Sequence, residues 1–198
     1  MSAGVQYLAL LRGINVGGRN VVPMADLRAA FARMEFADVA TYIASGNVLF
    51  NAPRQRREEL AARIESELTR GFGTELKVVV LTEAQLKRVI EGAPRGFGGD
   101  AHLCDVIFVR RPLTAKKALG LIELREGVDR AWQGTGVLYF SRLASKASSS
   151  RLSKFAARPE YKNVTVRSWR TTAKLSALMD SRNGGTEHVA TFDLPGAD

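Results

Sequence analysis

The sequence predicts an α+β fold made of two tandem ferredoxin-like units, each with the order βαββαβ, and a C-terminal helix. Strand and helix patterns follow this order once from the N-terminus and again after a break. The 198 residues, 45% of them hydrophobic, are enough to bury the core of one globular domain or two small ones. We place the units at residues 1–82 and 103–180, a linking helix and loop at 83–102, and a flexible tail at 181–198.

In the first unit, short apolar runs predict buried strands, and apolar residues three or four positions apart predict amphipathic helices. Ser45-Gly46-Asn47 is typical of a hairpin turn between two strands. A glycine-rich loop, Gly13–Asn20, separates the first strand from the first helix. The predicted elements are strand Tyr7–Leu11, helix Met24–Met34, strands Asp38–Tyr42 and Asn47–Phe50, helix Arg54–Arg70 and strand Leu76–Leu81.

The capping box Thr82–Gln85 begins a linking helix that runs to about Ile90, and the glycines of Pro94–Asp100 indicate a loop. The same alternation of patterns then predicts the second unit. Its elements are strand Asp105–Arg110, helix Thr114–Leu121, strands Val128–Trp132 and Val137–Ser141, helix Leu143–Phe155, strand Val164–Val166 and helix Ser168–Met179.

Composition excludes several classes of protein. A single cysteine, Cys104, rules out a disulfide framework and a multi-cysteine zinc site. His102 and His188 are too far apart for a local metal motif, and we expect no metal and no cofactor. No apolar run approaches the ~20 residues of a membrane helix, and no signal sequence is present. We therefore expect a soluble cytoplasmic protein without a nucleophilic triad, whose sequence does not say whether it is an enzyme.

The positive charge is concentrated in one part of the chain. The net charge is +9, and the stretch from Arg142 to Lys174 alone carries +8, because nine basic residues oppose only Glu160. Such a cluster favours an anionic partner. The alternative is a solvated basic face that aids solubility.

The glycine-rich loop is a candidate anion site. Successive backbone amides in such a loop can surround an anion. Its spacing approaches that of a nucleotide phosphate loop, but Arg19 and Asn20 replace the required Lys and Ser or Thr, which argues against an NTPase. The alternative is a tight strand-to-helix connection. We expect the Ser45–Asn47 turn to lie at a different edge of the sheet.

Our leading hypothesis is that the loop and the basic segment enclose one electropositive cleft for a phosphate-bearing or other anionic small molecule. Arginine forks, lysine ammonium groups and backbone amides all suit such a ligand. The candidate residues are Arg12, Gly13, Asn15, Gly17, Gly18, Arg19, Arg142, Lys146, Lys154, Arg167 and Lys174.

Two alternatives stay open. The protein could be an RNA- or DNA-binding module in which Tyr161 and Trp169 stack on bases, although both rings fit a hydrophobic core better. The usual aromatic RNA-recognition signature is absent from the sequence. The protein could instead be a structural or interaction protein without a ligand.

The sequence also resembles a known family. Leu10–Gly18, Tyr42-Ile43 and Ser45–Val48 in the first half resemble bacterial proteins grouped as domain of unknown function 1697. The later residues of the resemblance are Ser141-Arg142-Leu143, Lys154, Tyr161, Thr165, Arg167, Trp169, Thr171 and Lys174-Leu175. Arg19 and Ser168 depart from the family's common Lys and Asn. The resemblance implies a bacterial α+β protein with two ferredoxin-like halves and no established activity, substrate or cofactor.

Overall fold

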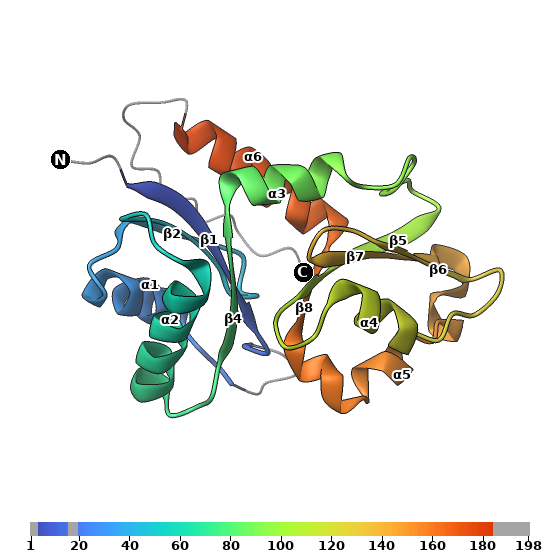
Figure 1. Cartoon of the computed structure of the whole chain (residues 1–198), viewed down its shortest axis with the longest axis horizontal. Helices are drawn as coiled ribbons and strands as arrows, with labels where there is room; N and C mark the ends of the chain where they lie inside the picture. The colour runs from blue at the N-terminus through green and yellow to red at the C-terminus, as the bar shows by residue number, and fades with distance from the viewer. Residues whose placement is uncertain (1–3, 16–19, 184–198) are drawn as a thin grey trace.

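The computed structural model describes residues 4–15 and 20–183 and shows two four-stranded antiparallel sheets with a C-terminal helix (Figure 1). The first sheet contains β1 (Val5–Arg12), β2 (Ala37–Tyr42), β3 (Asn47–Ala52) and β4 (Lys77–Thr82), and the second contains β5 (His102–Val109), β6 (Asp129–Gln133), β7 (Val137–Leu143) and β8 (Val164–Ser168). The helices are α1 (Met24–Arg33), α2 (Arg57–Phe72), α3 (Glu83–Glu91), α4 (Ala115–Leu121), α5 (Leu152–Ala156) and α6 (Trp169–Asn183), with 3-10 turns η1 (Ala144–Ser149) and η2 (Pro159–Asn163).

The two sheets have matching strand orders, β2-β3-β1-β4 and β6-β7-β5-β8. In each sheet the strand that comes first in the chain is central and pairs with an antiparallel neighbour on either side. β1 therefore ends where β3 and β4 begin, so this end of the sheet collects loops from distant parts of the chain.

Alternation along each central strand divides the hydrophobic core into layers. Tyr7, Ala9 and Leu11 of β1 face α1 and α2, whereas Leu8 and Leu10 face the second sheet. β5 alternates in the same way between the shared middle layer and the layer under α4 and α5. Because both faces of both sheets are covered, the central strands consist of nearly continuous apolar residues.

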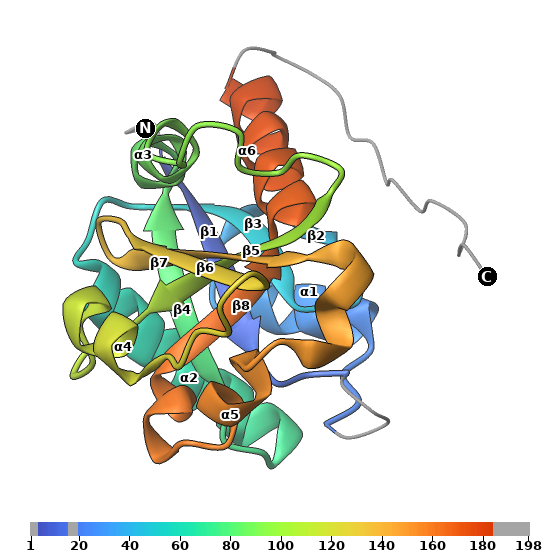
Figure 2. The same ribbon diagram turned by 90° about the vertical axis from the view of Figure 1, so that its right-hand side faces the viewer.

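Helices α3 and α6 lie side by side across the top of both sheets (Figures 1 and 2). Leu86 and Val89 of α3 and Leu175 and Met179 of α6 pack in the same middle layer as residues of both sheets. The two halves thus share one hydrophobic layer. Within the described residues, each helix is too short or too polar to span a lipid bilayer.

The predicted helix Leu143–Phe155 is wrong. β7 continues to Leu143, the 3-10 turn η1 follows, and α5 occupies only five residues. Ser148-Ser149-Ser150 interrupts the segment, because serine side chains compete for backbone hydrogen bonds and favour turns over helix interiors. Phe155 alone is buried within α5, so too little apolar surface is available to extend it.

Several boundaries differ from the predictions by a few residues, and two of these shifts change the assignment of a segment. β5 begins at His102, so this histidine lies in a strand opposite Leu143 rather than in a loop. α6 continues to Asn183, which includes the first three residues of the predicted tail. The rest of that tail, residues 184–198, lies outside the described residues.

Candidate functional site

The glycine-rich loop and the Ser45–Asn47 turn lie together, at the same end of the first sheet. The amide of Leu11 donates to the carbonyl of Gly46 at 2.8 Å, and Asn15 Nδ2 donates to the Ala44 carbonyl at 2.8 Å. Our expectation that they occupy different edges is wrong. β1 and β2 are both antiparallel to β3, so they run in the same direction and end at the same side.

Asn15 organises the described part of the glycine-rich loop. Its side-chain oxygen accepts from the Val22 amide at 2.8 Å, and its Nδ2 also donates to the Val22 carbonyl at 3.0 Å. Asn20 Nδ2 closes the loop on the Gly13 carbonyl at 3.0 Å. Both polar atoms of the Asn15 side-chain amide are therefore engaged in hydrogen bonds that hold the loop and the neighbouring turn. The candidate residues Gly17, Gly18 and Arg19 lie outside the described residues.

Arg167 joins the two halves of the molecule. This β8 residue is only 8% exposed, and its guanidinium is held by acceptors of the first half. The bonds run from Nε to Asn47 Oδ1 at 2.6 Å, from Nη2 to the carbonyls of Leu11 and Ser45, both at 2.7 Å, and from Nη2 to the Gly46 carbonyl at 3.3 Å. These contacts leave Arg167 unavailable for an anionic ligand.

Burial lowers the pKa of Arg167 to about 10, because desolvation penalises the charged form. That value still leaves the guanidinium protonated near neutral pH. A protonated guanidinium has only hydrogen-bond donors, and the surrounding carbonyl and amide oxygens are only acceptors. The Arg167 side chain is therefore complementary to its surroundings in both charge and hydrogen bonding.

The other candidates from the basic segment do not converge. Arg142 forms an ion pair with Asp105 at 2.7 Å, and Lys154 forms one with Glu123 at 2.8 Å. Lys146 lies in η1 and Lys174 on α6, and both are exposed. The charge cluster is local in sequence but is distributed over several surfaces.

A basic hollow nevertheless exists at the junction of the two halves. It has a volume of about 440 Å³ and lies where β1 ends, β4 begins and β5 has just ended. Of the predicted site residues in the described part of the chain, only Arg12 lines it. The lining residues are Arg12, Glu75, Lys77, Arg110, Arg111, Pro112, Lys162 and Asn163.

Five cationic side chains and one carboxylate line this basic hollow. Glu75 pairs with Lys77 at 2.5 Å, and Glu65, which lies behind them, pairs with Arg110 at 3.0 Å. With both carboxylates counted, three positive charges remain unbalanced. Lys77 lowers the pKa of Glu75, first by a hydrogen bond and then by its charge, and Lys162 and Arg110 lower it further.

Arg12 reaches the basic hollow from the end of β1, supported by an aromatic ring. Its guanidinium carbon lies 5.3 Å from the centre of the Tyr161 ring, a cation–π contact. Tyr161 belongs to η2 and packs edge-on against buried Phe155. Burial is the main cause that raises the pKa of the Tyr161 hydroxyl. The η2 turn thus fixes Arg12 and places the neighbouring Lys162 beside it.

Sequence reasoning missed four site residues: Lys77, Arg110, Arg111 and Lys162, the last of which lies in the basic segment. Arg110-Arg111-Pro112 follows an apolar strand, and such a basic pair at a strand end could have been noted. Lys77 carries no local signal, because it becomes part of the hollow only through the pairing of β4 with the end of β1.

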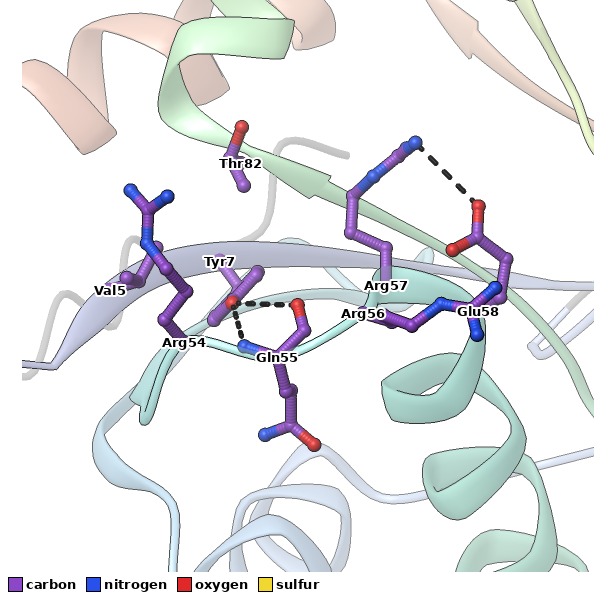
Figure 3. Close-up of a pocket in the computed structure, with 8 residues that line it drawn as sticks. All are labelled: Val5, Tyr7, Arg54, Gln55, Arg56, Arg57, Glu58 and Thr82. Atoms are coloured by element: carbon purple, nitrogen blue, oxygen red, sulfur yellow. Dashed lines mark hydrogen bonds and ion pairs between the residues drawn. The ribbon is translucent and has the colours of Figure 1, made fainter.

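A second hollow, of about 340 Å³, lies at the N-terminal end of α2 (Figure 3). Its cations are largely paired: Arg56 with Glu59 at 3.3 Å, and Arg57 with Glu58 at 3.7 Å. The Tyr7 hydroxyl in its wall is hydrogen-bonded to the backbone of Gln55. This hollow therefore offers an anion less unbalanced charge than the basic hollow.

Two further features bear on the chemistry of this chain: its single cysteine and its carboxylate and histidine side chains. Cys104 is buried, and desolvation is the main cause that raises its pKa, as expected of a structural thiol. Among the described residues, no group of three or more His, Cys, Asp or Glu side chains could hold a metal ion.

The Gly46 turn yields a prediction with a matched control. Gly13 and Gly46 have φ of 72° and 75°, but a Cβ on Gly46 would lie 2.8 Å from Ile14 Cδ1 and Leu11 Cβ, whereas one on Gly13 meets nothing within 4 Å. We expect Gly13→Ala to lower the free energy of unfolding by about 1 kcal/mol through backbone strain. Gly46→Ala should cost about 1–3 kcal/mol more through overpacking. Equal losses in urea denaturation would contradict this packing.

Arg167 yields a second prediction. Arg167→Met leaves buried acceptors of the first half without a donor, so we expect the free energy of unfolding to fall by about 3 kcal/mol or more. Arg167→Lys should recover part of this loss, because one ammonium cannot reproduce the guanidinium fork. Exposed Arg170→Lys is the control, with a change within about 0.5 kcal/mol. Urea denaturation that finds Arg167→Met as stable as the parent would contradict the bridging role.

Comparison with known proteins supports the fold. The protein resembles a solved structure, the conserved bacterial protein SP0830 from Streptococcus pneumoniae, with a TM-score of 0.77 and 23% identity over 88% of this chain and 98% of that one. No curated protein matches the sequence. A family model described as a protein of unknown function (DUF1697) matches residues 5–139. That match covers more than half of the chain and confirms the resemblance seen in the sequence: the chain belongs to the DUF1697 family.

Proposed function

We propose that this protein binds a phosphate-bearing or other anionic small molecule in the basic hollow. The single observation that carries the proposal is the convergence of five cationic side chains from both halves around a volume of about 440 Å³. Arg12 and Lys77 come from the first half, and Arg110, Arg111 and Lys162 from the second. A ligand here would contact both halves at once.

Two of these cations are free to receive a ligand. Arg111 and Lys162 are exposed, and neither has an ion pair or a side-chain hydrogen bond with a described residue. Arg12 is already oriented by the Tyr161 ring, so less side-chain freedom is lost when it binds. Guanidinium forks and an ammonium at one place suit the several oxygens of a phosphate.

We also propose that each half is a ferredoxin-like unit. The strand orders β2-β3-β1-β4 and β6-β7-β5-β8, with neighbouring strands antiparallel, support this assignment. On this reading the basic hollow lies where the ends of the two first strands, β1 and β5, approach each other. The ligand would then sit between two related units rather than within either one.

Ligand-induced stabilisation tests the proposal. We expect adenosine monophosphate or inorganic phosphate at millimolar concentration to raise Tm, and uncharged adenosine to leave it unchanged. At about 100 times Kd the gain is ~2.7 kcal/mol, or roughly 5–10 °C for a chain of this size. Arg111→Gln/Lys162→Gln should abolish the shift. The control Arg33→Gln/Arg88→Gln, which changes the charge equally on exposed faces of α1 and α3, should keep it.

No Tm shift with phosphate, pyrophosphate or a nucleotide panel would refute anion binding in this hollow. An equal loss of the shift in the two double variants would show that net charge alone is responsible, and would also refute a defined site.

Removal of the Glu75 carboxylate is expected to strengthen anion binding, whereas removal of the cations weakens it. It is the carboxylate in the hollow's lining and repels an incoming anion. Glu75→Gln should strengthen phosphate binding severalfold, because it removes a negative charge beside the bound anion. Isothermal titration calorimetry measures the change, with exposed Glu126→Gln as the control. Weaker or unchanged phosphate binding by Glu75→Gln would mean that phosphate does not enter this hollow.

A further inference from the structure

A second surface, which shares no residue with the basic hollow, combines aromatic rings with arginines that have no ion pair with a described residue. Phe97, Trp132 and Trp169, which we term the aromatic patch, come from the α3–β5 loop, β6 and the start of α6. The ring centre of Phe97 lies 6.1 Å from that of Trp132 and 5.2 Å from that of Trp169, both in edge-to-face contact. Segments distant in the chain thus assemble one aromatic cluster.

The aromatic patch is held in place by the core beneath it. Phe97 also packs edge-on against Tyr139 at 5.5 Å, and the Tyr139 hydroxyl donates to the Val89 carbonyl at 2.7 Å. The α3–β5 loop passes alongside α6 (Figure 2), so closely that a Cβ on Gly98 would lie 2.2 Å from Trp169 Cδ1. The patch therefore has a fixed geometry, and its three residues are only partly buried.

Three exposed arginines accompany these rings. Arg95 precedes Phe97 by two residues in the loop, and Arg170 follows Trp169 directly. Arg130 lies two residues before Trp132 on β6, and strand alternation puts the two on the same face of the sheet. None of the three arginines has an ion pair or hydrogen bond with a described residue. Their charges are available to a partner.

We propose that the aromatic patch, with Arg95, Arg130 and Arg170, binds single-stranded nucleic acid. Partly exposed rings offer stacking surfaces for unpaired bases, and unpaired guanidinium groups match the phosphates between them. An acidic peptide would use the charges but would leave the rings without stacking partners. This inference is independent of the small anion proposed for the basic hollow, because the two sites share no residue.

The protein's own fluorescence reports on this surface, because Trp132 and Trp169 are its two tryptophans. We expect oligothymidylate or oligouridylate of about twelve nucleotides at ~20 mM salt to quench that fluorescence, with an affinity that falls as salt rises. A duplex of equal length should quench less, because its bases are already stacked. Polyglutamate should not quench.

The matched variants locate the interaction. Arg130→Gln/Arg170→Gln should weaken oligonucleotide binding about tenfold or more and reduce the salt slope by about 1.4, the contribution of two phosphate contacts on a single strand. Lys116→Gln/Lys117→Gln changes the charge equally on α4, on the opposite face of the second sheet, and should leave binding unchanged. Arg111→Gln/Lys162→Gln of the basic hollow should also leave it unchanged.

Three results would overturn the proposal. No quenching by single strands at ~20 mM salt excludes the surface as a nucleic-acid site. Equal quenching by polyglutamate shows a site for acidic polymers in general. Loss of binding only in Arg111→Gln/Lys162→Gln assigns the oligonucleotide to the basic hollow, and this result would support the anion site while refuting the aromatic one.

Discussion

The buried guanidinium of Arg167 is the interaction on which the arrangement of the two halves depends. It crosses from β8 to the end of β1 and to the Ser45–Asn47 turn, where it donates to the carbonyls of Leu11 and Ser45 and to Asn47 Oδ1. Removing a buried charge's partners is costly, and so is leaving buried carbonyls without donors. Arg167 and the turn are therefore mutually necessary, and the contact specifies one position of the second half against the first.

The position of the basic hollow follows from that contact. With β8 docked on the end of β1, the η2 turn that precedes β8 comes beside Arg12, and Tyr161 packs under the guanidinium. Lys162 arrives with it, and Arg110 and Arg111 follow from the paired strand β5. A structural arginine thus helps to bring together the cations of the hollow, of which Arg111 and Lys162 have no ion pair with a described residue. A basic residue that recurs in a family's sequence pattern can therefore either hold the fold together, as Arg167 does, or face a ligand.

Local charge density proved a poor guide to the site. Arg142 and Lys154 are matched by Asp105 and Glu123, which lie 37 and 31 residues away in the chain. The net charge of a short sequence segment includes its basic residues but omits acidic partners that lie elsewhere in the chain. Conversely, Lys77 lies in a region of balanced charge and still reaches the hollow, because strand pairing moves it there. Electrostatic potential is a property of the folded surface, and the order of residues along the chain does not report it.

The sequence by itself determined the elements, their order and the family, because apolar alternation, helical spacing and turn residues act over a few positions. The mixed fold with two antiparallel sheets and a C-terminal helix was predicted, and the predicted helix that proved wrong is Leu143–Phe155, where a serine-rich segment has no strong hydrophobic period. Tertiary structure alone decided that Arg167 is buried and that Arg12 meets Tyr161. The physical reason is that both contacts join residues about 150 positions apart, whose meeting depends on how two separately patterned sheets pack.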